Sequence, residues 1–310
     1  MPEKIRIFWS DEAEAQFKAA YIANLEKWPV PCEEILVSTR FGETHVVASG
    51  PQAAAPLVLL NPGGGSCTIW IRNVAALSQS YRVYAVDVIG EMNPSVPTRR
   101  IGSHADFTAW MTDLFDGLHI EKTHLIGNSN GGFFALETAL ALPNRIRKVV
   151  LISPAATFVQ MWAFWLRLLI PAHLIAPVIR SEAMVLQAYE WLWQDFPMDP
   201  AFARLRSISK VCGYPRYRPS INSFAPHVFS DEELRRIRMP VLLLIGDHEV
   251  IYDPGQVIRR ATRLVANLQA VVVPNANHSA QYTAPEFVNS VILDFLSQDE
   301  ICSKEKGHVS

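Results

Sequence analysis

Cysteine is scarce and scattered in this chain of 310 residues. Its four cysteines, Cys32, Cys67, Cys212 and Cys302, form no CxxC pair and no Cys/His cluster along the sequence. A disulfide framework and a structural zinc site both depend on such closely spaced groups. The sequence therefore predicts a reduced, cytoplasmic protein that binds no metal.

A strong charge of either sign is also missing, since the formal net charge is −2. No basic face predicts nucleic acid as a partner, so we expect a neutral or weakly charged small-molecule substrate. The apolar stretch 161–179 approaches the length of a membrane span, but Arg167 lies inside it and two prolines, Pro171 and Pro177, interrupt it. Residues 1–9 show no export signal. We expect no stable membrane insertion, with contact at a membrane surface as the alternative for residues 161–179.

Nucleotide-binding motifs are absent as well. A glycine-rich loop, residues 61–66, follows an apolar run, and such loops can bind phosphate. The chain has neither GxGxxG nor GK[ST] there, however, and these are the patterns that hold phosphate groups on backbone amides. We expect no cofactor.

Two kinds of strand pattern follow one another along the chain. Residues 35–39 and 44–48 flank a short turn, which is typical of an antiparallel hairpin at a sheet edge. Six later runs are continuously apolar, as in strands buried on both faces of a parallel sheet: 57–60, 83–86, 124–126, 148–152, 241–245 and 270–273. Helix-length segments separate most of them. The pattern predicts an α/β fold with a mostly parallel central sheet flanked by helices.

One long interval breaks this alternation, after residues 148–152, which form the sixth predicted strand when the two hairpin strands are counted. It is rich in aromatic residues and ends in several prolines. We expect a core domain of residues 1–156 and 228–310, with a helical extension in residues 1–30, and a helical lid of residues 157–227. The lid aromatics would either line an apolar pocket or form the lid's own small core.

Helices are also predicted near both ends of the chain. Ser10 would cap a helix that runs to about Lys27 and packs an apolar stripe on the main domain. The last helix would span residues 285–296, and the polar residues 298–310 would fray.

The sequence GNSNGG at residues 127–132 lies between an apolar run and a helix-like segment. This context is typical of a nucleophile elbow, a sharp strand-to-helix turn that presents a serine hydroxyl above the sheet. Gly127 and Gly131 would permit the close approach of strand and helix. Ser129 is therefore the candidate nucleophile, and a simple connecting loop is the alternative.

A serine hydroxyl needs a base, and the base needs an orienting acid. His278 is the best-placed histidine, because it lies in a loop between the last predicted strand and the last helix. The loop after residues 241–245 offers three acids. Glu249 has the favoured spacing, Asp247 is better suited to bonding its own turn, and Asp253 precedes a proline as a helix cap would.

Acyl transfer also requires backbone N–H donors for the oxyanion. The amide of Asn130, directly after the nucleophile, is the first candidate. The second should come from the loop 61–66, where we favour Gly63 and keep Gly64 as the alternative, because Pro62 has no N–H. Cys67 as a nucleophile has less support, since it is not on the elbow.

Four stretches carry a family resemblance: Val37–Gly42, Tyr84–Gly90, Val228–Leu234 and Gly246–Tyr252. They resemble the naproxen-type carboxylesterases of the α/β-hydrolase superfamily. The resemblance implies a serine esterase whose triad acid is a glutamate, a sheet domain with a helical lid, and scaffold roles for Asp87 and Trp70. The family has His-Gly where this chain has Asn61-Pro62.

The expected activity is hydrolysis of carboxylic esters with an apolar part through an acyl-enzyme on Ser129. An acyltransferase, thioesterase or cyclase could use the same triad with another acceptor. A non-catalytic ligand-binding member of the fold is the third interpretation. A serine at the elbow, in place of aspartate, argues against dehalogenase or epoxide hydrolase chemistry.

Overall fold

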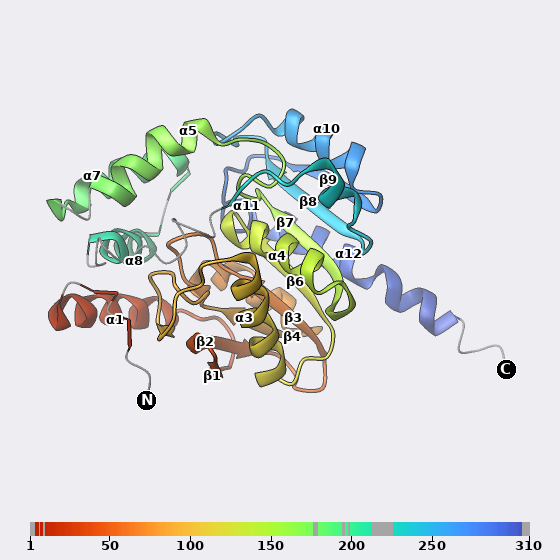
Figure 1. Ribbon diagram of the computed structural model, residues 1–310, viewed down its shortest axis with the longest axis horizontal. Coiled ribbons are helices and arrows are strands. Elements are labelled where there is room, and N and C mark those ends of the chain that lie inside the picture. Colours follow the sequence, from red (N-terminus) through yellow and green to blue (C-terminus); the bar gives the residue numbers. More distant parts are fainter. Residues whose placement is uncertain are drawn as a thin grey trace.

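The computed structural model describes residues 4–5, 7–8, 10–175, 179–193, 196–197, 199–211 and 226–305. Within these residues, nine strands form one sheet in the order β1-β2-β4-β3-β6-β7-β8-β9, and β5 pairs with β2 (Figure 1). The strands are β1 (Cys32–Thr39), β2 (Gly42–Ser49), β3 (Ala55–Leu60), β4 (Tyr81–Val86), β5 (Val96–Pro97), β6 (Thr123–Asn128), β7 (Ile146–Ile152), β8 (Val241–Gly246) and β9 (Leu268–Val273).

The strand directions confirm the predicted α/β fold. Strands β4, β3, β6, β7, β8 and β9 pair in parallel, while β1 and β2 form the predicted antiparallel hairpin at the edge. The two-residue β5 was not predicted, because it is too short to show a pattern. The sixth predicted strand is therefore β7.

Helices cover both faces of the sheet. One face packs against α1 (Asp11–Leu25), α2 (Val74–Leu77), α11 (Ala280–Thr283) and α12 (Pro285–Glu305). The other packs against α3 (His104–Gly117), α4 (Asn130–Ala141), α9 (Asp231–Arg235) and α10 (Pro254–Leu264). Alternate residues of β3 point to opposite faces, with Leu57 and Leu59 in one core and Val58 and Leu60 in the other.

Three sequence-based expectations need correction. Strand β9 is not buried on both faces, because it is the outer strand of the sheet and Val272 is 47% exposed. Helix α1 begins after Ser10 as expected, but ends at Leu25, earlier than predicted. Helix α12 continues to Glu305 and does not end at residue 296, since no glycine or proline interrupts residues 297–305.

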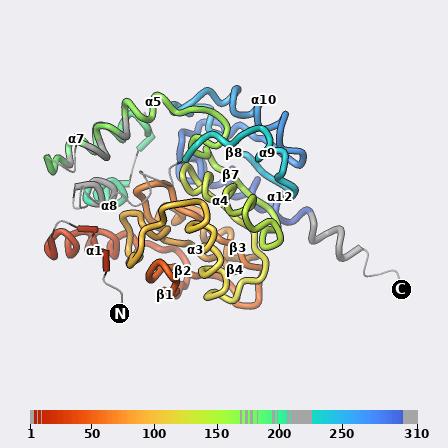
Figure 2. The backbone as a smooth tube through the Cα atoms, in the orientation of Figure 1, coloured from red at the N-terminus to blue at the C-terminus, as the bar shows by residue number. Residues whose placement is uncertain are grey.

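Between β7 and α9 the described residues include four helices, which we call the insertion helices: α5 (Trp162–Phe164), the π-helix η3 (Trp165–Ile175), α7 (Glu182–Trp193) and α8 (Pro200–Val211). Figures 1 and 2 place them together at one end of the molecule, with α1 beside α8. Asn24 Nδ2 of α1 donates to Ala201 O of α8 at 3.0 Å. The N-terminal helix therefore bridges the sheet domain and the insertion helices.

Part of the predicted lid lies outside the described residues, namely 176–178, 194–195, 198 and 212–225. The described helices include none that is both long and apolar enough to cross a membrane.

Candidate active site

Ser129 lies at the sharp turn between β6 and α4, as the elbow prediction requires. Its backbone is in the left-handed region, with φ 54° and ψ −118°, a conformation that non-glycine residues rarely adopt. A Cβ atom on Gly127 would lie 2.0 Å from Gly131 O, and one on Gly131 would lie 2.2 Å from Leu60 O. Strand and helix thus approach too closely for side chains at these positions, and the prediction for the two glycines is confirmed.

The turn is held in this strained form by neighbouring backbone. Ser129 N donates to Ile152 O at the end of β7, and Ala155 N donates to Ser129 O, both at 3.0 Å. Because β6 and β7 are parallel neighbours, the loop that follows β7 supports the elbow from the side. The conformation of Ser129 therefore depends on the sheet and not on the local sequence alone.

Glu249 and His278 form a buried pair. Glu249 Oε2 lies 2.7 Å from His278 Nδ1, and the side chains of Glu249 and His278 are 0% and 4% exposed. The other carboxylate oxygen, Oε1, accepts the backbone N–H groups of Val250 and Ile251, both at 2.9 Å. These two bonds compensate the buried charge and fix the orientation of the carboxylate.

The two competing acids have structural partners. Asp247 accepts the N–H groups of Asn275 and Ala276, both at 3.0 Å, so it fastens the loop before His278 and not its own turn as we expected. Burial would raise the pKa of Asp247, but these backbone donors outweigh it and the pKa is lowered. Asp253 caps α10 by accepting Gln256 N at 3.1 Å. Of the three acids, the described structure pairs Glu249 with His278.

Asn128 connects the elbow to the histidine loop. Its Nδ2 donates to His278 O at 3.2 Å and to Ile152 O at 3.1 Å. The residue before the candidate nucleophile therefore fixes the backbone of the candidate base. The sequence reasoning missed this role, although a polar residue within a buried strand is a signal for it.

The oxyanion loop, residues 61–66, lies against the start of α4. A Cβ atom on Gly63 would be 2.3 Å from Asn130 Nδ2, so the two predicted donor residues are adjacent. The N–H of Gly64 donates to Glu91 Oε2 at 2.7 Å, and that of Gly65 donates to Pro62 O at 3.0 Å. Among the described residues, no acceptor lies within hydrogen-bond distance of the N–H groups of Gly63 and Asn130.

Asn61 organises this loop from inside. Its Nδ2 donates to Pro62 O at 2.8 Å and to Gly65 O at 3.0 Å, while its Oδ1 accepts Val88 N at 2.9 Å. The side chain is almost fully buried. Where the resembled family has His-Gly, this chain has an amide that cross-links the loop internally and ties it to the end of β4.

Glu91 is a second residue that the sequence reasoning missed. It follows β4, and β4 pairs in parallel with β3, which precedes the oxyanion loop. Loops after the carboxyl ends of parallel neighbours meet at one edge of the sheet. That rule could have directed attention to an acidic residue after β4.

The aromatic residues of the insertion helices divide into two groups. Trp193 is buried, and its ring lies 5.9 Å from that of Phe202 and 5.3 Å from that of Tyr282, so it holds the insertion helices to the core. Trp162 is 72% exposed. Asn277 Nδ2 donates to Trp193 O at 3.1 Å, which places the end of α7 beside the loop of His278.

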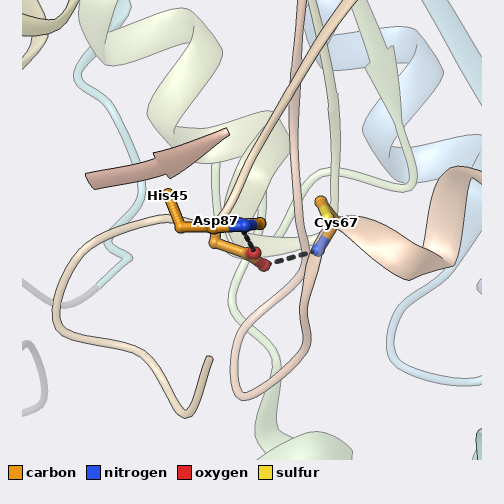
Figure 3. Close-up of side chains that lie close together, drawn as sticks. All are labelled: His45, Cys67 and Asp87. Carbon is orange, nitrogen blue, oxygen red and sulfur yellow. Dashed lines mark hydrogen bonds and ion pairs between the residues drawn. The ribbon is translucent and has the colours of Figure 1, made fainter. Parts of the chain in front are cut away.

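A second polar cluster lies under α1, where folding brings Cys67 close to His45 and Asp87 (Figure 3). One donor atom from each of these three buried residues lies within 4.8 Å of the others. These three residues are far apart along the chain, so only the fold brings them together. In the close-up, Asp87 lies between His45 and the backbone nitrogen of Cys67.

The side chains of this cluster are already joined by hydrogen bonds, to one another and to Tyr21. Tyr21 Oη lies 2.9 Å from Asp87 Oδ2, 3.2 Å from Cys67 Sγ and 3.5 Å from His45 Nδ1. His45 has a carboxylate at both ring nitrogens, Asp87 at Nδ1 and Glu34 at Nε2, each at 2.8 Å. The tyrosine hydroxyl therefore occupies the position among the three side chains that an ion would need.

The electrostatics of the cluster also oppose metal binding. Burial, followed by the charge of Asp87, raises the pKa of the Cys67 thiol well above its ordinary value. Burial would lower the pKa of His45, but Asp87 and Glu34 outweigh it and the pKa is raised. Metal ligands must lose these protons. The residues fit a hydrogen-bonded cluster, and the expectation that no metal binds stays a prediction.

Comparison with known proteins places this arrangement in a family. The α/β-hydrolase fold family matches residues 55–285, which is more than half of the chain. The chain belongs to this family.

Within it, two relatives at 37% identity are carboxylesterases. The chain is 37% identical over 287 residues to the uncharacterized carboxylesterase nap of Bacillus subtilis, covering 92% of this chain and 93% of that one. It is also 37% identical to the carboxylesterase YbfK of the same organism, over 93% of this chain and 96% of the relative. The crystal structure of the B. subtilis naproxen esterase, carboxylesterase NP, superposes with a TM-score of 0.83 at 37% identity, covering 93% of this chain and 99% of that one. The resemblance to naproxen-type carboxylesterases is confirmed.

Proposed function

We propose that the protein hydrolyses small carboxylic esters with an apolar part through an acyl-enzyme on Ser129. The proposal rests mainly on the buried carboxylate–imidazole pair of Glu249 and His278. The backbone of His278 is hydrogen-bonded to Asn128, the residue before Ser129, which has φ 54°. The carboxylesterase relatives support ester hydrolysis in general, and the chain is a carboxylic ester hydrolase. The acyl-enzyme mechanism on Ser129 is our own proposal.

In this mechanism the Glu249 carboxylate holds the proton of His278 on Nδ1 and leaves Nε2 as the base. Ser129 Oγ attacks the ester carbonyl while His278 takes its proton. The carbonyl π electrons move to oxygen, and the tetrahedral intermediate then expels the alcohol, which receives the proton from His278. Water repeats the sequence on the acyl-enzyme and releases the acid. Glu249 stabilises the imidazolium in both halves of the reaction.

The oxyanion would form between the elbow and the glycine-rich loop. We assign the donors to the N–H groups of Gly63 and Asn130, each contributing about 3 kcal/mol in the transition state. Gly64 is the poorer candidate because its N–H already donates to Glu91 at 2.7 Å. The contact of Gly63 with Asn130 supports this choice.

We also infer that residues 157–227 form a helical lid beside this site. The bond from Asn277 to Trp193 O and the contact between the rings of Trp193 and Tyr282 support this, because Asn277 precedes His278. The lid would supply the apolar surface for the acyl or alcohol group. A cytoplasmic location and the lack of a nucleic-acid partner stay predictions.

The proposal is tested with short p-nitrophenyl esters and a fluorophosphonate. The wild-type protein should cleave the esters and take the phosphonyl label on Ser129, located by peptide mass spectrometry. In Ser129→Ala we expect no label and a kcat lower by about 10⁴-fold or more. Unchanged ester turnover in Ser129→Ala would refute the serine mechanism.

Acyl transfer to another acceptor is separated from hydrolysis in the same assay. Adding a primary alcohol or amine should leave the free acid as the main product if water is the natural acceptor. If the ester or amide of the added acceptor predominates at millimolar concentration, the protein is an acyltransferase using the same acyl-enzyme.

A further inference from the structure

The oxyanion loop is tied to one other segment of the chain at three points. Val88 N donates to Asn61 Oδ1 at 2.9 Å, Gly64 N donates to Glu91 Oε2 at 2.7 Å, and Cys67 N donates to Asp87 Oδ1 at 2.7 Å. All three outside partners come from residues 87–91, directly after β4. The loop is therefore held at its start, in its middle and at the residue directly after its end by the same neighbour.

The middle bond differs from the other two, because it holds the part of the loop with the most conformational freedom. Gly64 has φ +61°, a left-handed conformation, and lies between two further glycines. Glycine has no Cβ to restrict its rotation, so a run of three specifies its own geometry weakly. The position of the Gly63 N–H therefore depends on what fixes Gly64.

Glu91 is itself held in place. Its N–H donates to Val88 O at 3.2 Å, and its carbonyl accepts Asn93 N at 3.0 Å. Asn93, which is almost fully buried, also donates from Nδ2 to Val88 O at 2.8 Å. The carboxylate thus extends from a braced turn, and an ionised carboxylate accepts an N–H more strongly than a neutral group does.

We propose that Glu91 is a positioning residue for ester hydrolysis: its carboxylate fixes the Gly64 N–H and thereby directs the Gly63 N–H toward the oxyanion. Glu91 would act through the loop, because its carboxylate accepts the Gly64 N–H. Its effect rests on the proposed function, because a correctly placed donor matters where negative charge develops on a carbonyl oxygen. A preorganised donor stabilises that charge without reorganisation during the reaction.

Kinetics of Glu91→Ala and Glu91→Gln test the proposal. We expect kcat of Glu91→Ala to fall by about tenfold, less than for outright loss of an oxyanion donor, while KM changes by less than about twofold. Glu91→Gln should restore most of kcat, because the amide oxygen can still accept the Gly64 N–H. A structural role alone would lower the unfolding midpoint and leave kcat unchanged.

A matched control removes a similar bond elsewhere. Glu233 Oε2 accepts Ser230 N at 2.8 Å at the start of α9. Glu233→Ala should lose stability as Glu91→Ala does, but keep the wild-type kcat. Equal kcat values for wild type, Glu91→Ala and Glu233→Ala would overturn the proposal.

Backbone hydrogen exchange gives a second readout that needs no activity. The peptide covering residues 61–66 should exchange faster in Glu91→Ala than in wild type, with Glu91→Gln between them. Unchanged exchange overturns the proposal. If Ser129→Ala keeps full ester turnover, the serine mechanism fails instead, and the exchange data still decide whether Glu91 orders the loop.

Discussion

The carboxyl edge of the sheet and the insertion helices are stabilised in different ways. At the sheet edge, the candidate site residues are fixed by short hydrogen bonds, such as Glu249 to His278 at 2.7 Å and Gly64 to Glu91 at 2.7 Å. The helices instead expose apolar surface: seven of the eleven exposed large hydrophobic side chains among the described residues lie within residues 162–186. The contrast indicates that hydrogen bonds position the candidate site residues at the sheet edge, whereas a few buried aromatic contacts attach the insertion helices.

The largest expected effect follows from removing one of the polar contacts at the sheet edge, the one between Glu249 and His278. Glu249→Gln replaces the carboxylate by an amide that can donate to Nδ1 and so favours the wrong tautomer of His278. We expect kcat on a p-nitrophenyl ester to fall by about 10⁴-fold. Asp253→Asn, which keeps a capping oxygen for α10, should retain the wild-type kcat. If Asp247→Asn collapses activity and Glu249→Gln does not, the acid is assigned wrongly.

The next effect concerns the buried aromatic contacts that attach the insertion helices. Trp193→Ala should lower the free energy of unfolding by about 4 kcal/mol, because it removes a buried ring that packs on Phe202 and Tyr282. Trp162→Ala removes an equally large but 72% exposed ring and should change it by less than about 0.5 kcal/mol. Urea denaturation measures both. Equal losses would show that the two tryptophans are not packed as described.

A smaller and pH-dependent effect concerns His45, in the polar cluster under α1. The pKa of His45 is raised because Asp87 and Glu34 outweigh the effect of burial, so its contribution to stability is fully present below its unfolded value of 6.5 and is lost as pH rises through the folded pKa. His45→Gln should cost about 2 kcal/mol at pH 6 and less at pH 9, measured by thermal unfolding. A difference that grows with pH would contradict this assignment.

Local patterns were sufficient for most of the fold. The apolar runs predicted β3, β4, β6, β7 and β8 because side chains buried on both faces leave a continuous signal. Strand β9 has the same apolar composition but lies at the edge. Its exposure could not be predicted, since the order of strands in a sheet is set by tertiary packing and not by the run itself.

The site shows the same division. The elbow at Ser129 could be recognised because its glycines lie within a few residues of it, and the structure confirms their close packing. Glu91 and Asn128 were missed, because each acts on a loop that is distant in sequence and the sequence signals for them name no partner. The roles of the catalytic residues themselves stay predictions that the variants above decide.

The position of Tyr21 gives the thiol of Cys67 an experimental use. The sulfur is fully buried and lies 3.2 Å from the tyrosine hydroxyl that α1 inserts above it. An alkylating reagent can reach it only when local opening exposes it. With Cys32, Cys212 and Cys302 replaced, the rate at which Cys67 is alkylated would report how often the N-terminal helix detaches.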